Sequence, residues 1–184
     1  MKQFFFSILD VIKVVALAAV SVILVRDFLV QPFLVSGLSM APTFDNGDYL
    51  LIDELTYRLR LPERGEVIVF RPPSDPSTYY IKRIIGLPGE RVEFRDGKVY
   101  IVNDMYPEGI SLGESYLEGG ILTSGTSRLL QSGEYFVMGD NRSYSKDSRS
   151  WSVMLPHKNI VGLVRLRLWP IGKAQAFGAP AYQF

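Results

Sequence analysis

The segment SGLSMAPT, residues 36–43, has the composition of a turn that presents a nucleophilic serine. Its Gly37 permits backbone conformations that other residues resist, and Pro42 stiffens the exit from the turn. A serine held at this point, Ser39, can present its hydroxyl for attack and direct its own N–H at a developing oxyanion. An ordinary turn between two strands has the same composition, so the segment alone does not identify a nucleophile.

A second segment, YYIKRIIGLPGE over residues 79–90, contains a lysine that burial would activate. In a β-strand Lys82 shares one face with Tyr80 and Ile84, which favours burial of its side chain. Burial disfavours the ammonium form and lowers the pKa, which makes the amine a general base. The alternative is a lysine that reaches solvent from the edge of a strand.

A third segment, GDNRSYSKDSR over residues 139–149, follows the apolar run Tyr135–Met138. Its polar and charged side chains are dense enough to hydrogen-bond one another and to orient a neighbouring group. Asp147 and Arg149 are two residues apart, so they share a face in an extended chain. The alternative is a solvated loop, and the glycosylation sequon at Asn141 is interpreted as incidental.

The composition leaves few other groups for catalysis. The 184 residues include no cysteine and one histidine, His157, which excludes thiol nucleophiles and disulfides and makes a Cys/His zinc site untenable. A Ser-His-Asp site would have to use His157 itself. We expect neither a metal nor a cofactor. The 20 basic and 19 acidic side chains nearly balance, which argues against nucleic acid as a partner.

Short apolar or alternating runs predict a mostly β domain, a barrel or sandwich, over residues 31–184. Seven runs have strand length, namely Tyr49–Ile52, Val67–Phe70, Tyr79–Ile85, Val92–Phe94, Val99–Val102, Tyr135–Met138 and Ile160–Leu168. Turn signals separate them, and Asp96-Gly97 predicts a hairpin. Asp53–Leu61 hints weakly at a helix. Residues 103–132, rich in Gly and Ser, are expected to form a long loop or a small insertion.

The N-terminal stretch differs sharply in composition, because it is apolar and all Gly and Pro residues come after residue 31. A membrane-spanning helix needs ~20 predominantly apolar residues. Residues 8–30 reach that length and include charged residues such as Asp10 and Lys13, which can pair three residues apart on a helix. We therefore predict a membrane anchor over residues 1–30. The alternative is a cleaved signal peptide, whose apolar core is shorter.

The three segments, in this order after an apolar N-terminus, resemble the type I (leader) signal peptidases of bacteria, which are membrane-anchored Ser/Lys proteases. Residues 36–43 resemble that family's Ser-Gly-x-Ser-Met-x-Pro-Thr motif. Residues 82–90 resemble its Lys-Arg-x-x-Gly-x-Pro-Gly-Asp motif, with Glu90 in place of the final Asp. Residues 139–149 match its Gly-Asp-Asn-Arg-x-x-Ser-x-Asp-Ser-Arg motif at every specified position. The resemblance covers most of the chain and is weakest over residues 103–132.

The resemblance implies a role for each matching residue. Ser39 would be the nucleophile and Lys82 its general base. Ser145 would hydrogen-bond Lys82 and orient it. Asp147 and Arg149 would form a supporting ion pair that maintains the shape of the site.

The resemblance also implies an oxyanion site in which the Ser39 N–H is one donor. In some members of the family the second donor is a serine hydroxyl two residues before the nucleophile. This chain has Gly37 there, so the second donor is left open. Met40 and its apolar neighbours are expected near the bilayer surface.

By resemblance, the function is that of a serine endopeptidase that removes signal peptides from secretory preproteins. It would cut after small-x-small sites, typically Ala-x-Ala, through an acyl-enzyme. Preproteins and the lipid bilayer are the expected partners. The protein would lie in the plasma or inner membrane as a single-pass protein, with the catalytic domain outside. Lys2 and Lys13 favour a cytoplasmic N-terminus.

Three other interpretations stay open at this point. The chain could be a related Ser/Lys peptidase with a narrower task, such as the processing of one conjugation or pilus protein. It could be a membrane-anchored binding or scaffolding module, although intact Ser39, Lys82 and Ser145 speak against a dead enzyme. The self-cleaving repressor-type relatives share the Ser/Lys fold, but they carry a DNA-binding domain where this chain has its apolar N-terminus.

Overall fold

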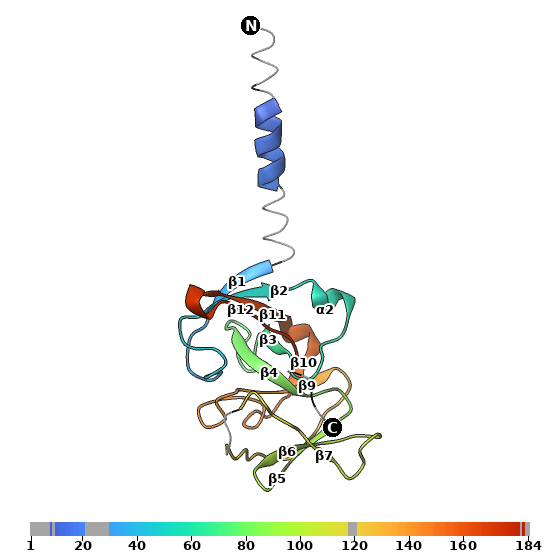
Figure 1. Ribbon diagram of the computed structural model, residues 1–184. Helices are drawn as coiled ribbons and strands as arrows, with labels where there is room; N and C mark the ends of the chain where they lie inside the picture. The colour runs from blue at the N-terminus through green and yellow to red at the C-terminus, as the bar shows by residue number, and fades with distance from the viewer. Residues whose placement is uncertain (1–7, 9, 21–29, 118–120, 181, 183–184) are drawn as a thin grey trace.

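The computed structural model describes residues 8, 10–20, 30–117, 121–180 and 182, and most of them belong to a β domain (Figure 1). Its larger sheet has eight strands, and every hydrogen-bonded pair in it is antiparallel. Seven strands follow one another across the sheet in the order β1 (Val30–Leu34), β2 (Tyr49–Asp53), β11 (Ile160–Trp169), β3 (Val67–Phe70), β4 (Tyr80–Gly86), β9 (Glu134–Met138) and β10 (Leu155–Pro156). The eighth, β12 (Gln175–Ala176), pairs with β11.

A second sheet of four strands lies at the end of the domain away from β1 and β2 (Figure 1). Its order is β7 (Ile110–Ser111), β6 (Lys98–Val102), β5 (Arg91–Arg95) and β8 (Arg128–Leu129). The predicted hairpin at Asp96-Gly97 is confirmed: both residues have positive φ, 49° and 75°, as a two-residue hairpin turn requires. Residues 103–132 supply β7 and β8, so this stretch is part of the small sheet.

The larger sheet curls because its middle strands bury both faces. In β3, Val67 and Val69 belong to one apolar cluster, while Ile68 and Phe70 belong to the other. Alternate residues of a strand point to opposite faces, so a continuous apolar run fills two cores at once. The cluster that contains Val67 also contains Met40, which follows the predicted nucleophile.

All seven predicted strands are present, with ends shifted by at most one residue. The predicted helix is reduced to the single turn α2 (Thr56–Leu59), and two short 3₁₀ helices, η1 (His157–Asn159) and η2 (Ile171–Lys173), were not predicted. Strand β1 was missed because it directly continues the apolar N-terminal stretch. It also contains Pro32, which is tolerated because β1 lies at the end of the strand order.

The N-terminal stretch is described over residues 8 and 10–20, which are helical. Lys13 Nζ lies 3.2 Å from Asp10 Oδ1, so the predicted pairing of these two residues is confirmed. None of the described helices is both long enough and apolar enough to cross a membrane. The remainder of the predicted anchor, residues 1–7, 9 and 21–29, lies outside the described residues.

Candidate active site

Ser39 lies in the turn between β1 and β2, and hydrogen bonds tie the base of this turn together. The N–H of Val35 donates to Asp48 O at 2.9 Å, and the N–H of Gly47 donates to Val35 O at 2.9 Å. Gly37 has a φ of 103°, and its N–H donates to Asn46 Oδ1 at 2.8 Å. The sequence-based expectation of an unusual backbone at Gly37 is therefore confirmed. A side chain here would be strained by the backbone, although the space around it is open.

The side chain of Met40 lies in the core of the domain, and the expected position of Met40 near the bilayer surface stays a prediction. Its side chain is 1% exposed and packs in the apolar core beside Phe44 and Leu50. The buried Met40 side chain anchors the turn to this apolar core. Successive residues of the turn point in different directions. Leu38, on the other side of Ser39, is 60% exposed.

Lys82 projects from β4 toward the serine turn. Its Nζ lies 2.6 Å from Ser39 Oγ and 2.8 Å from the carbonyl oxygen of Ile81, and it donates to both. The side chain is 4% exposed, so the burial expected from the strand pattern is confirmed. The ring of Tyr80, on the same face of the strand, has its centroid 5.5 Å from Nζ.

The surroundings of Lys82 lower the pKa of its ammonium to about 8, from an ordinary value of 10.5. Burial is the main cause, and the negative charges of Asp147 and Asp140 offset part of it. A lysine of this pKa is unprotonated in a useful fraction of molecules near neutral pH. Its amine can then accept the proton of the hydroxyl that lies beside it.

The third segment closes around Gly139, which follows β9. The Gly139 N–H donates to Asp147 Oδ2 at 3.0 Å and to Ser145 Oγ at 3.1 Å. Asp147 is completely buried and forms an ion pair with Arg149, whose Nε and Nη2 lie 2.9 and 3.0 Å from its two oxygens. The N–H of Asn141 donates to Ser39 O at 3.0 Å, which joins this segment to the serine turn.

Ser145 differs from what the resemblance implies. Among the described residues, its hydroxyl is engaged by the Gly139 N–H, and the Lys82 ammonium donates to Ser39 and Ile81. Gly139 packs closely against both segments, and an added Cβ there would lie 2.3 Å from both Ser145 Oγ and Ser39 O. Ser145 is thus held next to the serine turn through Gly139, with no direct bond to the lysine.

A buried ion pair behind the lysine was not predicted from the sequence. Arg83, the next residue of β4, points to the opposite face and donates to Asp140 through Nε at 2.9 Å and Nη2 at 2.6 Å. Thr43 Oγ1, from the serine turn, donates to the same carboxylate at 2.6 Å. Asp140 therefore connects all three segments. The sequence offered one signal for this ion pair: Arg83 lies in the second of the three segments and Asp140 in the third.

The reacting groups open into a cleft of about 480 Å³. Ser39 and Lys82 line it together with apolar side chains from the neighbouring strands, which include Phe33, Val35, Leu50, Val69 and Ile81. Two side chains from the third segment, Tyr144 and Lys146, complete the lining. A cleft with a nucleophile, a base and an apolar wall is suited to acyl transfer.

Comparison with known proteins gives consistent matches. The family model described as signal peptidase, peptidase S26, matches residues 8–169. A signal peptidase I of Pseudomonas fluorescens is 35% identical over 190 residues, which cover 77% of this chain and 65% of that protein. A signal peptidase I of Leptolyngbya laminosa is 32% identical and covers 94% of this chain and 85% of that protein. A crystal structure of a signal peptidase I from Enterococcus faecalis V583 is 32% identical, with a TM-score of 0.47 over 56% of this chain and 97% of that chain.

The share of each relative that is covered varies. The chain spans 65% of the length of the two Pseudomonas proteins that it matches, and 85% of the Leptolyngbya protein. The family match nevertheless includes all three segments that form the cleft and every strand except β12. The chain therefore belongs to the signal peptidase family, peptidase S26.

Proposed function

We propose that the protein is a signal peptidase I, a serine endopeptidase that cleaves signal peptides from secretory preproteins. The observation that carries the proposal is the 2.6 Å separation of Ser39 Oγ and Lys82 Nζ at the wall of an apolar cleft. Within the described chain no carboxylate is hydrogen-bonded to this buried lysine, so its charge is only weakly stabilised. The proposal fits the relatives, which are named signal peptidase I.

In the proposed mechanism, neutral Lys82 accepts the proton of the Ser39 hydroxyl as Oγ attacks the scissile carbonyl carbon. The Ser39 N–H donates to the oxyanion that forms. Collapse of this intermediate breaks the peptide bond, and the leaving amine takes the proton from Lys82. The same lysine then activates a water, which hydrolyses the acyl-enzyme and restores Ser39.

The supporting groups act through position. The Asp147–Arg149 ion pair and the Gly139 N–H that binds Asp147 stabilise the shape of the third segment, and the Asn141 N–H that donates to Ser39 O joins this segment to the serine turn. Ser145 contributes to the same connection through Gly139. These contacts keep Ser39 within reach of Lys82, which is the geometric requirement for proton transfer.

We propose that the substrate carries small residues immediately before the cut, typically Ala-x-Ala. The cleft wall is formed by apolar side chains, among them Phe33, Leu50 and Ile81. Small apolar side chains fit such a wall, whereas bulky ones would displace the carbonyl from Ser39. Replacing the alanine before the cut with a large residue should abolish cleavage.

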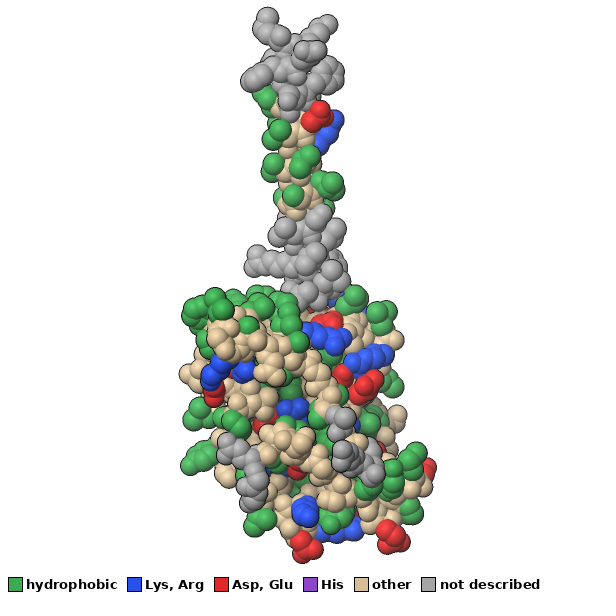
Figure 2. Space-filling model, in the orientation of Figure 1, with side chains coloured by type: hydrophobic (Ala, Val, Ile, Leu, Met, Phe, Trp, Pro, Cys, Tyr) green, Lys and Arg blue, Asp and Glu red, His purple; other side chains and the backbone are tan. Residues whose placement is uncertain are grey.

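We also propose that residues 1–30 anchor the catalytic domain to the extracytoplasmic face of the membrane, with the N-terminus inside. Support comes from the described part of this stretch, whose apolar side chains are exposed all round: Ile8, Val11, Ile12, Val14, Val15, Leu17 and Val20. The Asp10–Lys13 ion pair is the charged part of this surface, and the exposed apolar side chains around it favour an apolar environment. Figure 2 shows further hydrophobic side chains on the end of the domain that carries β1 and β2, and the exposed ones there include Leu34, Tyr49, Leu168 and Trp169.

The test is cleavage of a preprotein with an Ala-x-Ala site by the detergent-solubilised protein. We expect one cut, directly after the second alanine, with the product masses measured by mass spectrometry. Ser39→Ala and Lys82→Ala should each abolish the cut. The matched controls are Ser152→Ala and Lys158→Ala, which remove an exposed serine and an exposed lysine outside the cleft and should leave the cut intact.

Failure of the folded wild-type protein to cut would overturn the general signal-peptidase assignment. A panel of other preproteins would then separate a peptidase of narrower specificity from a binding module. Cleavage that survives in Lys82→Ala would contradict the role of the lysine.

A further inference from the structure

Lys146 is the solvent-exposed charged side chain in the part of the cleft that the structure describes. The other charged residue of the lining, Lys82, is buried against Ser39. Within the described chain Lys146 makes neither an ion pair nor a side-chain hydrogen bond, whereas most buried cations near the site are paired. The ammonium of Lys146 is therefore a positive charge at the cleft that no described protein group neutralises, and it is accessible to a bound substrate.

No aspartate or glutamate lines this cleft among the described residues. The carboxylates closest to Lys146 in the sequence are committed elsewhere. Asp147 is completely buried and pairs with Arg149, and Asp140 pairs with Arg83. Neither carboxylate can turn toward the cleft without breaking a buried ion pair, which is strongly unfavourable.

The backbone on both sides of Lys146 is held next to the reacting groups. Its neighbours Ser145 and Asp147 both accept the Gly139 N–H, and Asn141 N–H donates to Ser39 O. The base of the Lys146 side chain is therefore fixed beside the serine turn, while its exposed ammonium can move to meet a substrate group.

We infer that Lys146 is a specificity-determining residue whose ammonium binds an acidic side chain of the substrate close to the cut. The inference rests on the proposed function and deepens it, because it adds a charge preference to the requirement for small residues. The motif that residues 139–149 resemble leaves position 146 unspecified. A charge preference that depends on Lys146 would therefore be a property of this chain and not of the motif.

The geometry of an extended peptide limits where the acid can lie. The last residue before the cut and the one two before it must be small, so neither can be acidic. Side chains alternate along an extended chain. Near the cut, the residue between the two small ones and the first two residues after the cut are free to carry Asp or Glu, and because of this alternation they cover both faces of the peptide.

The experiment compares peptides that share an Ala-x-Ala site and carry either Asp or Asn at one of these three positions. The measured quantity is the ratio of kcat/KM for the Asp peptide to that for the Asn peptide, at low ionic strength. Both values come from one enzyme preparation, so the folded fraction cancels. The wild type should favour Asp by about threefold or more at one position at least, as an accessible ion pair allows.

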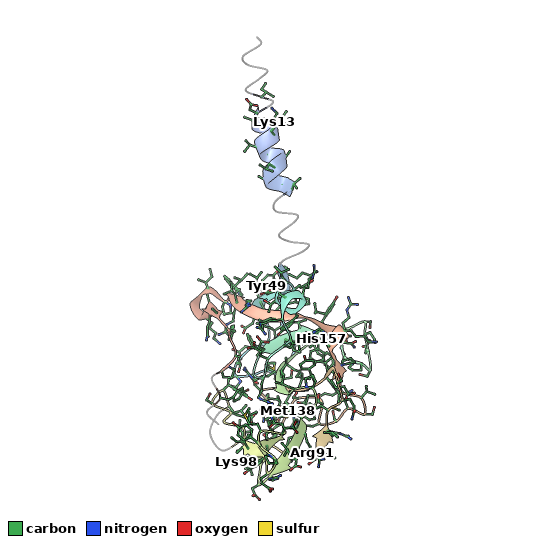
Figure 3. The ribbon with its side chains drawn as sticks, turned by 90° about the vertical axis from the view of Figure 1, so that its right-hand side faces the viewer. Lys13, Tyr49, Arg91, Lys98, Met138 and His157 are labelled. Atoms are coloured by element: carbon green, nitrogen blue, oxygen red, sulfur yellow. The ribbon has the colours of Figure 1, made fainter. Side chains whose placement is uncertain are left out.

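Lys146→Gln should bring this ratio close to one, and Lys146→Glu should reverse the preference. The control Lys98→Glu makes the same change in net charge on an exposed residue of β6 and should keep the wild-type ratio. Figure 3 shows Lys98 at the opposite end of the domain from Tyr49, which pairs with the cleft residue Leu34.

A wild-type enzyme that cleaves the peptides with a ratio of one at all three positions would overturn the inference and leave the proposed function standing. A preference that survives in Lys146→Glu, or that disappears equally in Lys98→Glu, would also overturn it. A wild type that cleaves none of the peptides would overturn the proposed function, and the inference with it.

Discussion

Strand β4 buries two cations on opposite faces, and the groups around them stabilise the positive charge to different extents. Lys82 and Arg83 are each 4% exposed. On one face the Arg83 guanidinium donates two hydrogen bonds to Asp140 and a third to Gly65 O at 2.8 Å. On the other face the partners of Lys82 are a hydroxyl and a main-chain carbonyl.

The pKa of each group follows from this difference. Burial lowers the pKa of Lys82 to about 8, and distant carboxylates recover only part of the loss. Burial also acts against the charge of Arg83, but the hydrogen bonds and the charge of Asp140 raise its pKa above the ordinary value. The Asp140 carboxylate stabilises the charge of Arg83, whose guanidinium stays protonated in any case, whereas Lys82 has no carboxylate at hydrogen-bond distance and becomes available as a base.

The largest expected effect comes from replacing Lys82 with arginine, the residue type of its neighbour Arg83. Lys82→Arg should lower kcat/KM by about 10³-fold, because a guanidinium stays protonated and cannot act as a general base. Cleavage of the Ala-x-Ala preprotein measures the effect. The same substitution at the exposed Lys158 is the control. An active Lys82→Arg enzyme would show that the difference between the two faces has no catalytic meaning.

Removing the carboxylate that pairs with Arg83 should mainly reduce the stability of the protein. Asp140→Asn leaves the Arg83 charge buried and unpaired, which should lower the free energy of unfolding by about 3–5 kcal/mol. Urea denaturation in detergent measures it. The control is Asp45→Asn, which breaks the exposed ion pair with Lys173 (2.7 Å). This control should cost less than about 1 kcal/mol. Equal losses in the two variants would refute the contrast.

Removing the charge of Lys82, which has no carboxylate partner, should increase the stability of the protein. The pKa of Lys82 is about 8 in the folded protein and near 10.5 when unfolded, so between these values the unfolded chain binds the extra proton. Wild-type stability therefore rises with pH through this window. Lys82→Met should be more stable than the wild type by up to about 3 kcal/mol at pH 7.

This advantage of Lys82→Met should shrink as the pH rises from 8 and should vanish near pH 10.5. Thermal or urea unfolding at several pH values tests the trend. An advantage that is constant across the range would mean that the lysine carries no pKa shift.

The unpaired lysine also predicts how activity depends on pH. The base must be neutral, and with a pKa of about 8 its neutral fraction grows as the pH rises. The value of kcat/KM should therefore increase about tenfold between pH 7 and pH 9. A flat profile through this range would contradict the assignment of Lys82 as the base.

The smallest effect is expected at His157, which lies outside the cleft lining, in η1 beside the ring of Tyr135 (Figure 3). His157→Ala should leave turnover nearly unchanged. The same cleavage assay tests this expectation, and a loss comparable to that of Lys82→Ala would mean that the imidazole, and not the lysine, is the base.

Much of the fold followed from local pattern. The seven predicted strands and the hairpin at Asp96-Gly97 came from apolar runs and turn residues, whose effects act within a few positions. The strands β7, β8, β10 and β12 are two residues long and escaped prediction, because so short a run has no detectable period. The hint at Asp53–Leu61 gave a single helical turn because few of its residues are buried.

The candidate site was predictable in its residues and less so in its contacts. Ser39 and Lys82 were singled out from their segments and lie side by side in the structure, 43 residues apart in the chain. The bond between Ser145 and Lys82 was expected and does not occur among the described residues, and the burial of Met40 in the core was not predicted. The Arg83–Asp140 pair, 57 residues apart, gave no local signal.

The sequence by itself determined which chemical groups are available: no thiol, one imidazole, and a serine and a lysine in segments with a family pattern. It also determined that Lys82 and Arg83 must face opposite ways, because a strand has a period of two. Only the tertiary structure decided that Asp140 meets Arg83 while Ser39 meets Lys82. The reason is that desolvation and hydrogen bonding depend on what packs against a side chain from distant parts of the chain, and at Lys82 these lower the pKa enough for the lysine to act as a base.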